Sequence, residues 1–153
     1  MPSNTSRDIS QLLLRVFISL GFIFPVLDRL GYLGAAGVNG NAWGNWNNFI
    51  GYTQTLMPYF NQATTSVMGT AATILEALFA IGLLLGFKTR LMAIGSGLLT
   101  FAFAVSMLLF ADYRAPLTYS VFVVSFASFL LASLRYHKWS IDSQREKFTR
   151  HDR

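Results

Sequence analysis

The sequence contains no cysteine, which excludes several kinds of chemistry. Disulfides, thiol redox reactions, iron–sulfur clusters and cysteine-ligated metals all require a cysteine sulfur. Histidine is almost as scarce, since the only two, His137 and His151, both stand in the C-terminal tail and not within an apolar segment that could enclose a haem or metal. Phosphate-binding loops, dinucleotide fingerprints and serine-nucleophile motifs are also missing. We therefore expect no metal site and no intrinsic cofactor, and electron transfer would require a diffusible quinone or a borrowed redox centre.

Charged residues are the second scarcity, at 12% of the chain against about 25% in soluble domains. Glu76 is the only charged residue between Leu30 and Phe87, and residues 91–111 contain none. A water-soluble helix needs a polar face, and most of these segments have none. The net charge of +5 comes from basic residues at the ends of apolar segments, which is typical of membrane proteins and argues against a nucleic-acid partner.

The long apolar runs predict an all-α integral membrane protein. A helix needs about 20 mostly apolar residues to cross roughly 30 Å of hydrocarbon. Four segments meet this requirement and predict a four-helix transmembrane bundle within residues 11–134: residues 11–33, 65–87, 91–111 and 116–134. In the first, only about 18 Å of helix separates Arg15 from Asp28, so one of these polar positions must lie below the headgroups or be shielded by protein.

Lysine and arginine in the connections predict the orientation of the spans. The segment at residues 34–64 has neither, whereas the turn between the second and third spans carries Lys88 and Arg90, and residues 135–153 form a basic tail. We expect residues 1–10 and the tail to be cytoplasmic and, in a bacterial inner membrane, residues 34–64 to be periplasmic. The tail is expected to be a solvated, partly disordered end near anionic lipid, with a docking helix for a soluble partner as the alternative.

The segment 34–64 changes from a Gly- and Asn-rich stretch to large apolar residues at helical spacing. This pattern predicts an amphipathic helix from Trp46 to Met57 at the outer interface, because Pro58 would end it. Trp43 and Trp46 would be aromatic anchors there, or contacts for a bound substrate. An ordered loop is the alternative.

Four polar residues near the apolar segments are candidate site residues. Glu76 lies about 18 Å along its helix from Lys88, which places it near the middle of the bilayer, where an acid is a functional candidate by default. Glu76 and Asp28 are therefore the candidates for proton chemistry, and Arg15 and Arg29 for substrate binding. Arg15 could instead pair with Glu76 and fix two helices in register, and Arg29 could simply anchor the first span.

Small residues at four-residue spacing predict close helix contacts. The second and third spans each carry such a pair: Gly82 with Gly86, and Ala93 with Gly97. Packing within one bundle is the default interpretation, and a homo-oligomer is the alternative. The hydroxyl residues of the fourth span, including Ser125 and Ser128, would form hydrogen bonds between helices or line a pocket for a quinone headgroup.

Four stretches in order resemble the DoxX family (DoxX/DoxD-like small membrane proteins) and together cover about Leu12 to Ala132. They are LLLRVFISLGFIFPVLDRLG, WGNWNNFIGYTQTLMP, ATILEALFAIGLLLGFKTR and APLTYSVF. Arg15, Asp28, Glu76 and Arg90 match recurrent polar positions of that family. The chain departs from one branch at Thr118, where an acid is usual, and at Arg29, where lysine is common.

The resemblance implies a four-helix bundle in a bacterial inner membrane and a redox-associated role. Family members with an assigned activity are subunits of thiosulfate:quinone oxidoreductase, and others scaffold membrane redox complexes. We therefore expect a subunit of a quinone-linked or redox-associated membrane complex, in which catalysis by this chain is an open question. The alternatives are a non-catalytic scaffold that recruits soluble redox or stress proteins, and a small carrier or channel that uses Glu76.

Overall fold

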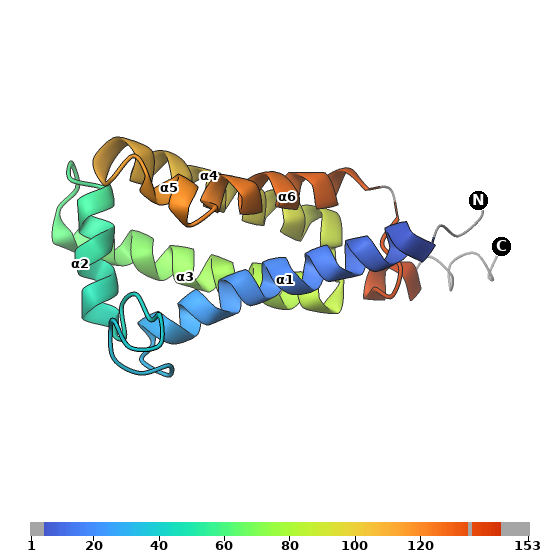
Figure 1. The fold of residues 1–153 in the computed structure, drawn as a ribbon, viewed down its shortest axis with the longest axis horizontal. Coiled ribbons are helices and arrows are strands. Elements are labelled where there is room, and N and C mark those ends of the chain that lie inside the picture. Colours follow the sequence, from blue (N-terminus) through green and yellow to red (C-terminus); the bar gives the residue numbers. More distant parts are fainter. Residues whose placement is uncertain (1–4, 135, 145–153) are drawn as a thin grey trace.

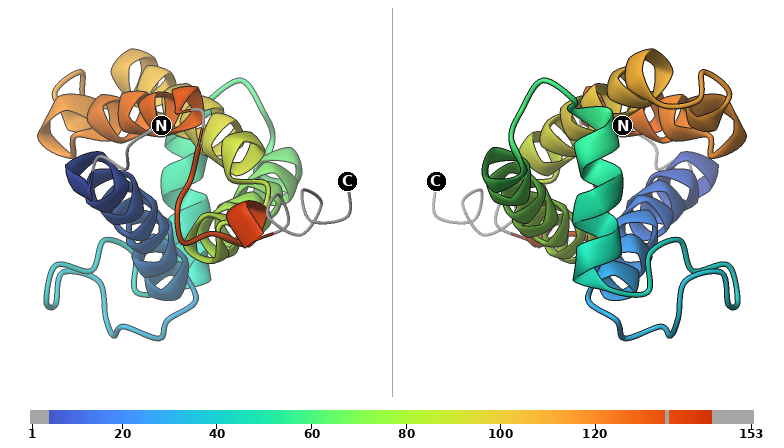
Figure 2. Two further views of the ribbon diagram at one scale, coloured as in Figure 1. Left: turned by 90° about the vertical axis from the view of Figure 1, so that its right-hand side faces the viewer. Right: turned by 90° about the vertical axis from the view of Figure 1, so that its left-hand side faces the viewer.

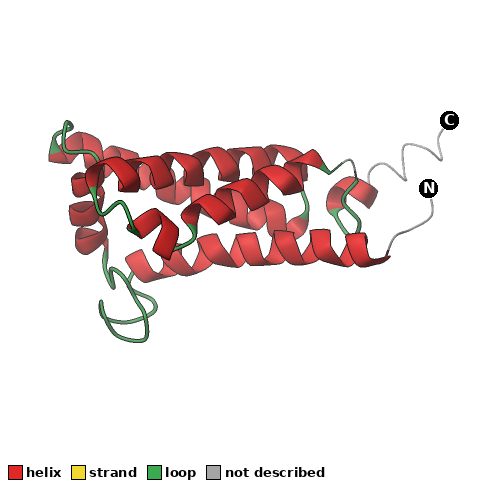
Figure 3. Cartoon of the chain, turned by 45° about the horizontal axis from the view of Figure 1, so that its top comes forward, coloured by secondary structure: helices red, strands yellow, loops and turns green. Residues whose placement is uncertain are grey.

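The structure, a computed structural model, describes residues 5–134 and 136–144, and this part of the chain is helical without strands (Figure 3). The helices are α1 (Thr5–Arg29), α2 (Trp46–Leu56), α3 (Gln62–Leu85), α4 (Thr89–Phe110), α5 (Ala115–Thr118) and α6 (Val121–Ser133). The long helices lie side by side, and α2 lies across one end of them (Figure 1). In the end views α2 lies across the end of the bundle formed by α1, α3 and α4 (Figure 2).

Three helices, α1, α3 and α4, are long and apolar enough to cross a membrane. Their bounds differ from the predicted spans mainly at α1, which begins at Thr5 and ends at Arg29, before Leu33. The outward faces are apolar: on α3, for example, Val67, Ile74 and Leu78 each expose more than half of their surface. Such faces would be costly in water but suit lipid, so the three helices indicate a membrane protein.

The predicted fourth span is not one continuous helix. Tyr119 and Ser120 separate the four residues of α5 from the thirteen of α6, and Ser120 has a left-handed backbone with φ of 54°. Thr, Tyr and Ser are mediocre helix formers, and their run at residues 118–120 follows the helix start at Pro116. Alone, α6 is about 20 Å long, shorter than the hydrocarbon thickness. The expectation of an unbroken span over residues 116–134 is therefore wrong.

The small residues of α3 and α4 face other helices of the same chain. A side chain at Gly82 would collide with Met92, and one at Gly97 would collide with the ring of Phe129. Ala93 is completely buried in the apolar core. Ser125 adds an interhelical hydrogen bond from its hydroxyl to the Gly97 carbonyl, 2.9 Å long. Gly82, Ala93 and Gly97 thus serve packing inside the bundle, whereas Gly86 is the left-handed C-cap of α3, with φ of 69°, and lies beside Arg15 and Ser140. The prediction of Gly86 as a helix-packing residue of the second span is therefore wrong.

Residues 136–144, which we call the C-terminal strap, fold back onto the end of the bundle opposite α2. Lys138 pairs with Asp8 at 2.8 Å, and Asp142 contacts the start of α4. Ser140 and Ser143 are buried. The prediction of a solvated tail is therefore wrong for this part, and residues 145–153 lie outside the described residues.

Candidate functional site

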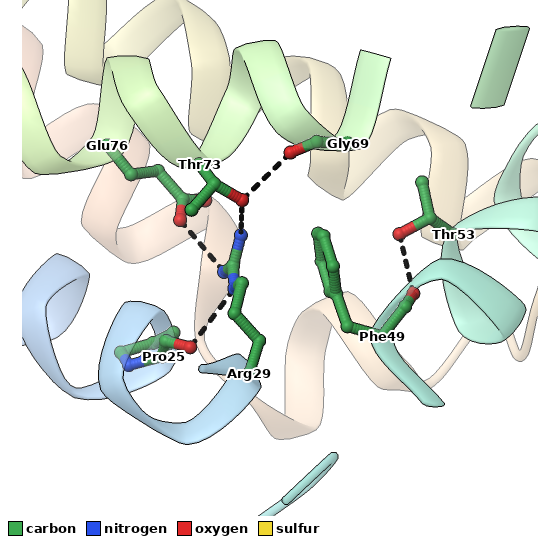
Figure 4. A network of polar contacts seen from close by, with 7 residues as sticks. All are labelled: Pro25, Arg29, Phe49, Thr53, Gly69, Thr73 and Glu76. Carbon is green, nitrogen blue, oxygen red and sulfur yellow. Dashed lines mark hydrogen bonds and ion pairs between the residues drawn. The ribbon is translucent and has the colours of Figure 1, made fainter. Parts of the chain in front are cut away.

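Arg29 and Glu76 form a buried ion pair near the α2 end of the bundle (Figure 4). Arg29 Nη2 lies 2.8 Å from Glu76 Oε2, and both side chains are at most 5% exposed. Arg29 Nη1 donates to the Thr73 hydroxyl at 3.0 Å, and that hydroxyl donates to the Gly69 carbonyl. Arg29 Nε donates to the carbonyl of Pro25, one turn earlier in α1. The ion pair thus ties the end of α1 to the middle of α3.

Aromatic rings cover the guanidinium of Arg29 on the side of α2. Its central carbon lies 4.1 Å from the ring centre of Phe49 and 5.1 Å from that of Trp43. A guanidinium over an aromatic face gains a cation–π attraction, which is larger where water is excluded. A Cβ at Gly69 would lie only 2.8 Å from Ile50 and 3.3 Å from Phe49, so the glycine allows α2 to lie close against α3. Arg29 is therefore held on all sides by α1, α2 and α3.

Direction along the helices explains why Glu76 pairs with Arg29 and not with Arg15. Helical side chains point toward the N-terminus of their own helix. Because α1 and α3 run in opposite directions, Arg29 and Glu76 tilt toward each other, whereas Arg15 tilts away from Glu76. The predicted alternative of an Arg15–Glu76 pair is therefore wrong.

Arg15 instead joins three segments at the opposite end of the bundle. It is completely buried, and its guanidinium donates to the carbonyls of Leu83 and Leu84 at the end of α3, at 2.9 and 3.2 Å. It also donates to the carbonyls of Lys138 and Trp139 in the strap. The last carbonyls of a helix lack partners within the helix and favour a cation. Arg15 is thus a structural cap for α3 and leaves no surface for a substrate.

Asp28 stabilises the connection before α2. Its carboxylate accepts backbone hydrogen bonds from Ala42, Trp43 and Gly44, at 2.8 to 3.1 Å. Three converging backbone N–H groups form a concave anion-binding site, which Asp28 fills from within the chain. Arg29, the next residue, points into the bundle, so the two neighbours serve different faces of α1. Asp28 therefore fixes the loop that carries Trp43.

The two tryptophans predicted as anchors or substrate contacts lie around α2. Trp43 packs edge-on against Phe49 at 5.3 Å and belongs to the covering of Arg29. Trp46 begins α2, is partly exposed and also packs against Phe49, with ring centres 5.3 Å apart. Trp43 is also partly exposed, so both tryptophans combine an aromatic surface with some access from outside.

The strap contains a polar contact that the sequence did not indicate. Asp142 accepts hydrogen bonds from the backbone N–H groups of Lys88 and Thr89 and from the Thr89 hydroxyl, at 2.8 to 2.9 Å. Partial burial raises the pKa of Asp142, but the hydrogen bonds from Thr89 and Lys88 outweigh it and hold the pKa below its ordinary value. Asp142 caps α4 from 53 residues away in sequence. Because Asp142 is distant in sequence from α4, only the general preference of helix N-termini for acidic side chains could have suggested this contact.

The described residues contain no group of three or more His, Asp or Glu side chains that could hold a metal ion. No protein-family model, no curated protein and no solved structure matches this chain. The structure places Arg29, Glu76, Asp28 and Trp43 in one region and Arg15 at the opposite end.

Proposed function

We propose that this chain is a DoxX-like, four-pass protein of a bacterial inner membrane that acts as a non-catalytic subunit of a redox-associated complex. The fold has three apolar helices of sufficient length, and in this proposal α5 and α6 together form a fourth, broken crossing. The basic residues of the α3–α4 turn and of the tail favour a cytoplasmic location for both termini.

Contacts between the beginning and the end of the chain support a fourth crossing. Asp8 and Gln11 in the first turns of α1 contact Lys138, which follows α6. The α4–α5 connection lies at the other end, beside α2, where Tyr59 packs on Phe110. The segment from Ala115 to Ser133 therefore runs the length of the bundle, and its break near Ser120 lies only a few residues from Arg114.

The observation that carries the non-catalytic role is that the buried charges are paired or hydrogen-bonded within the protein. Arg15 caps α3, Asp28 fills a backbone nest, and Arg29 is enclosed by Glu76, Thr73 and aromatic rings. A proton carrier or catalytic acid needs access to a substrate or water, whereas these groups contact the protein itself. Their arrangement favours architecture, with activity supplied by partner proteins.

Purification in mild detergent tests this proposal. We expect the intact chain to recover a redox protein at constant stoichiometry, and the double variant Arg29→Gln/Glu76→Gln to recover the same protein. Removal of residues 145–153 would show whether the basic end binds that partner, and it leaves the strap intact. A folded wild-type protein that recovers no partner, or flux through vesicles that disappears in Glu76→Gln, would contradict the proposal.

A further inference from the structure

The strap holds a tryptophan outward in a strained backbone conformation. Trp139 has a φ of 53°, a left-handed conformation that bulky residues rarely adopt, and 55% of its surface is exposed. Backbone strain of this kind persists only where the surrounding structure enforces it, and it is common at sites that hold a ligand. The fold therefore keeps the indole ring of Trp139 available to a partner outside the chain.

Buried polar side chains fix this part of the strap from the inside. Arg15 Nη1 donates to the carbonyls of Lys138 and Trp139, at 3.2 and 3.3 Å. Gln11 Nε2 donates to the Lys138 carbonyl at 3.0 Å, and both donor side chains are buried. Because the two carbonyls are held toward the bundle, the ring of Trp139 remains on the outer side.

Arg15 also fixes the level of Trp139 along the bundle. The same guanidinium donates to the Leu84 carbonyl at 3.2 Å, so the backbone of Trp139 lies level with the last turn of α3. Leu84 is 46% exposed, as suits a neighbour of acyl chains, and the exposed residues Lys88 and Arg90 follow about one turn later. Trp139 therefore lies where apolar surface gives way to basic residues, which is the level at which tryptophan is enriched in membrane proteins.

The free charges at this end of the bundle are basic. Three exposed basic residues form no ion pair within the part of the chain that the structure describes: Arg7, Lys88 and Arg90. The acids nearby are engaged, since Asp8 pairs with Lys138 and Asp142 caps α4. At the opposite end, the exposed charges Asp112 and Arg114 cancel each other. An anionic partner is therefore favoured at the strap and not at the end covered by α2.

We propose that the strap, the α3–α4 turn and the first turn of α1 bind the anionic phospholipid headgroups of the cytoplasmic leaflet. The ring of Trp139 lies beside the glycerol esters of these lipids, and Lys88 and Arg90 contact their phosphates. A soluble acidic protein does not fit, because the half-exposed apolar surface of Leu84 at the same level requires lipid around the ring. The inference rests on the membrane placement in the proposed function, but it requires no redox partner.

Fluorescence quenching measures which lipid lies beside Trp139. The double variant Trp43→Phe/Trp46→Phe leaves Trp139 as the only tryptophan. The purified full chain is placed in nanodiscs of mixed phosphatidylcholine and phosphatidylglycerol. In parallel samples, one or the other lipid carries bromine near the carboxyl end of one acyl chain, at the same mole fraction.

Two substitutions on this background separate the strap from the rest of the molecule. Lys88→Gln/Arg90→Gln removes both charges of the α3–α4 turn and leaves the backbone N–H groups that Asp142 accepts from. Arg114→Gln is the matched control, because it removes the charge of an exposed arginine at the opposite end. Raising the ionic strength on the unsubstituted background weakens the same attraction without any change in the chain.

We expect brominated phosphatidylglycerol to quench Trp139 at least about twofold more than brominated phosphatidylcholine at low salt. Lys88→Gln/Arg90→Gln and high salt should make the two lipids equal, whereas Arg114→Gln should retain the difference. Equal quenching at low salt, or a difference that persists without Lys88 and Arg90, would overturn the anionic site. Quenching by neither lipid would overturn the insertion of Trp139. The recovery of a partner protein, which tests the proposed function, is a separate measurement and is unaffected by these outcomes.

Discussion

Arg29 and Glu76 depend on each other, because each leaves a buried charge if the other is removed. Breaking a buried pair costs about 3–5 kcal/mol, whereas removing both charges costs much less. We expect Arg29→Gln and Glu76→Gln each to lower the thermal stability in detergent strongly, and the double variant to be more stable than the sum of the two effects predicts. Additive losses in this double-mutant cycle would mean that the ion pair contributes no coupling.

Substitutions of Arg15, the second buried arginine, test whether its role is structural. Its four hydrogen bonds to carbonyls require the planar guanidinium, so Arg15→Lys should retain the charge and lose most of the geometry. We expect both Arg15→Lys and Arg15→Ala to lower the melting temperature, the second by more. Arg7→Ala, on an exposed position of the same helix, is the control and should have little effect. A wild-type melting temperature in Arg15→Ala would contradict the capping role.

At the residue scale, the sequence indicated which charges matter but not their partners. Glu76 and Arg15 were recognised because charges in apolar segments are expensive. The alternative that they pair with each other is wrong, because depth along a helix was considered without the direction of the side chains. Because α1 and α3 are antiparallel, the tilt of each side chain toward the N-terminus of its own helix brings Glu76 toward Arg29 and not toward Arg15.

At the scale of single elements, α4 owes its first turn to a residue of the strap. Asp142 supplies the cap that Lys88, in a left-handed conformation, does not provide with its own side chain. We expect Asp142→Asn to destabilise the fold by about 1 kcal/mol and to increase hydrogen exchange at the amides of Lys88 and Thr89. Asp112→Asn, at the opposite end of α4, is the control and should leave that exchange unchanged.

The same cap has a defined pH dependence. Because the pKa of Asp142 is lowered in the fold, its stabilisation is present above the ordinary aspartate pKa and disappears as the pH falls through the lowered value. The difference between wild type and Asp142→Asn should therefore be constant near neutral pH and shrink below about pH 4. A difference that instead grows under acidic conditions would contradict this assignment.

The sequence predicted the long helices and α2 but not the break between α5 and α6, and the difference has a physical reason. The three long apolar runs were found because length and hydropathy are local properties. The crossing helix α2 follows from apolar spacing, with its side-chain cap at Asn45 and its end just before Pro58. The break between α5 and α6 was missed because the hydropathy of residues 116–134 is continuous, whereas the helix geometry changes at Ser120.

At the scale of the whole molecule, different contacts close the two ends of the bundle. At one end, α2 and the loop held by Asp28 cover the Arg29–Glu76 pair. At the other, Arg15 and Asp142 hold the strap against α1, α3 and α4. Such long-range contacts join residues more than 50 positions apart, so no local sequence pattern could have revealed them. They also explain why the strap is packed although its composition is typical of a solvated tail.

The central claim, four crossings with both ends of the chain on one side, is tested most directly by single-cysteine labelling in sealed inverted membrane vesicles. The chain has no cysteine of its own, so each variant carries one reactive site. We predict that a membrane-impermeant maleimide labels Arg7→Cys and Gln144→Cys but not Asn39→Cys or Tyr113→Cys until detergent is added. Labelling of Arg7→Cys and Gln144→Cys from opposite sides would mean that α5 and α6 do not cross, and would contradict the account.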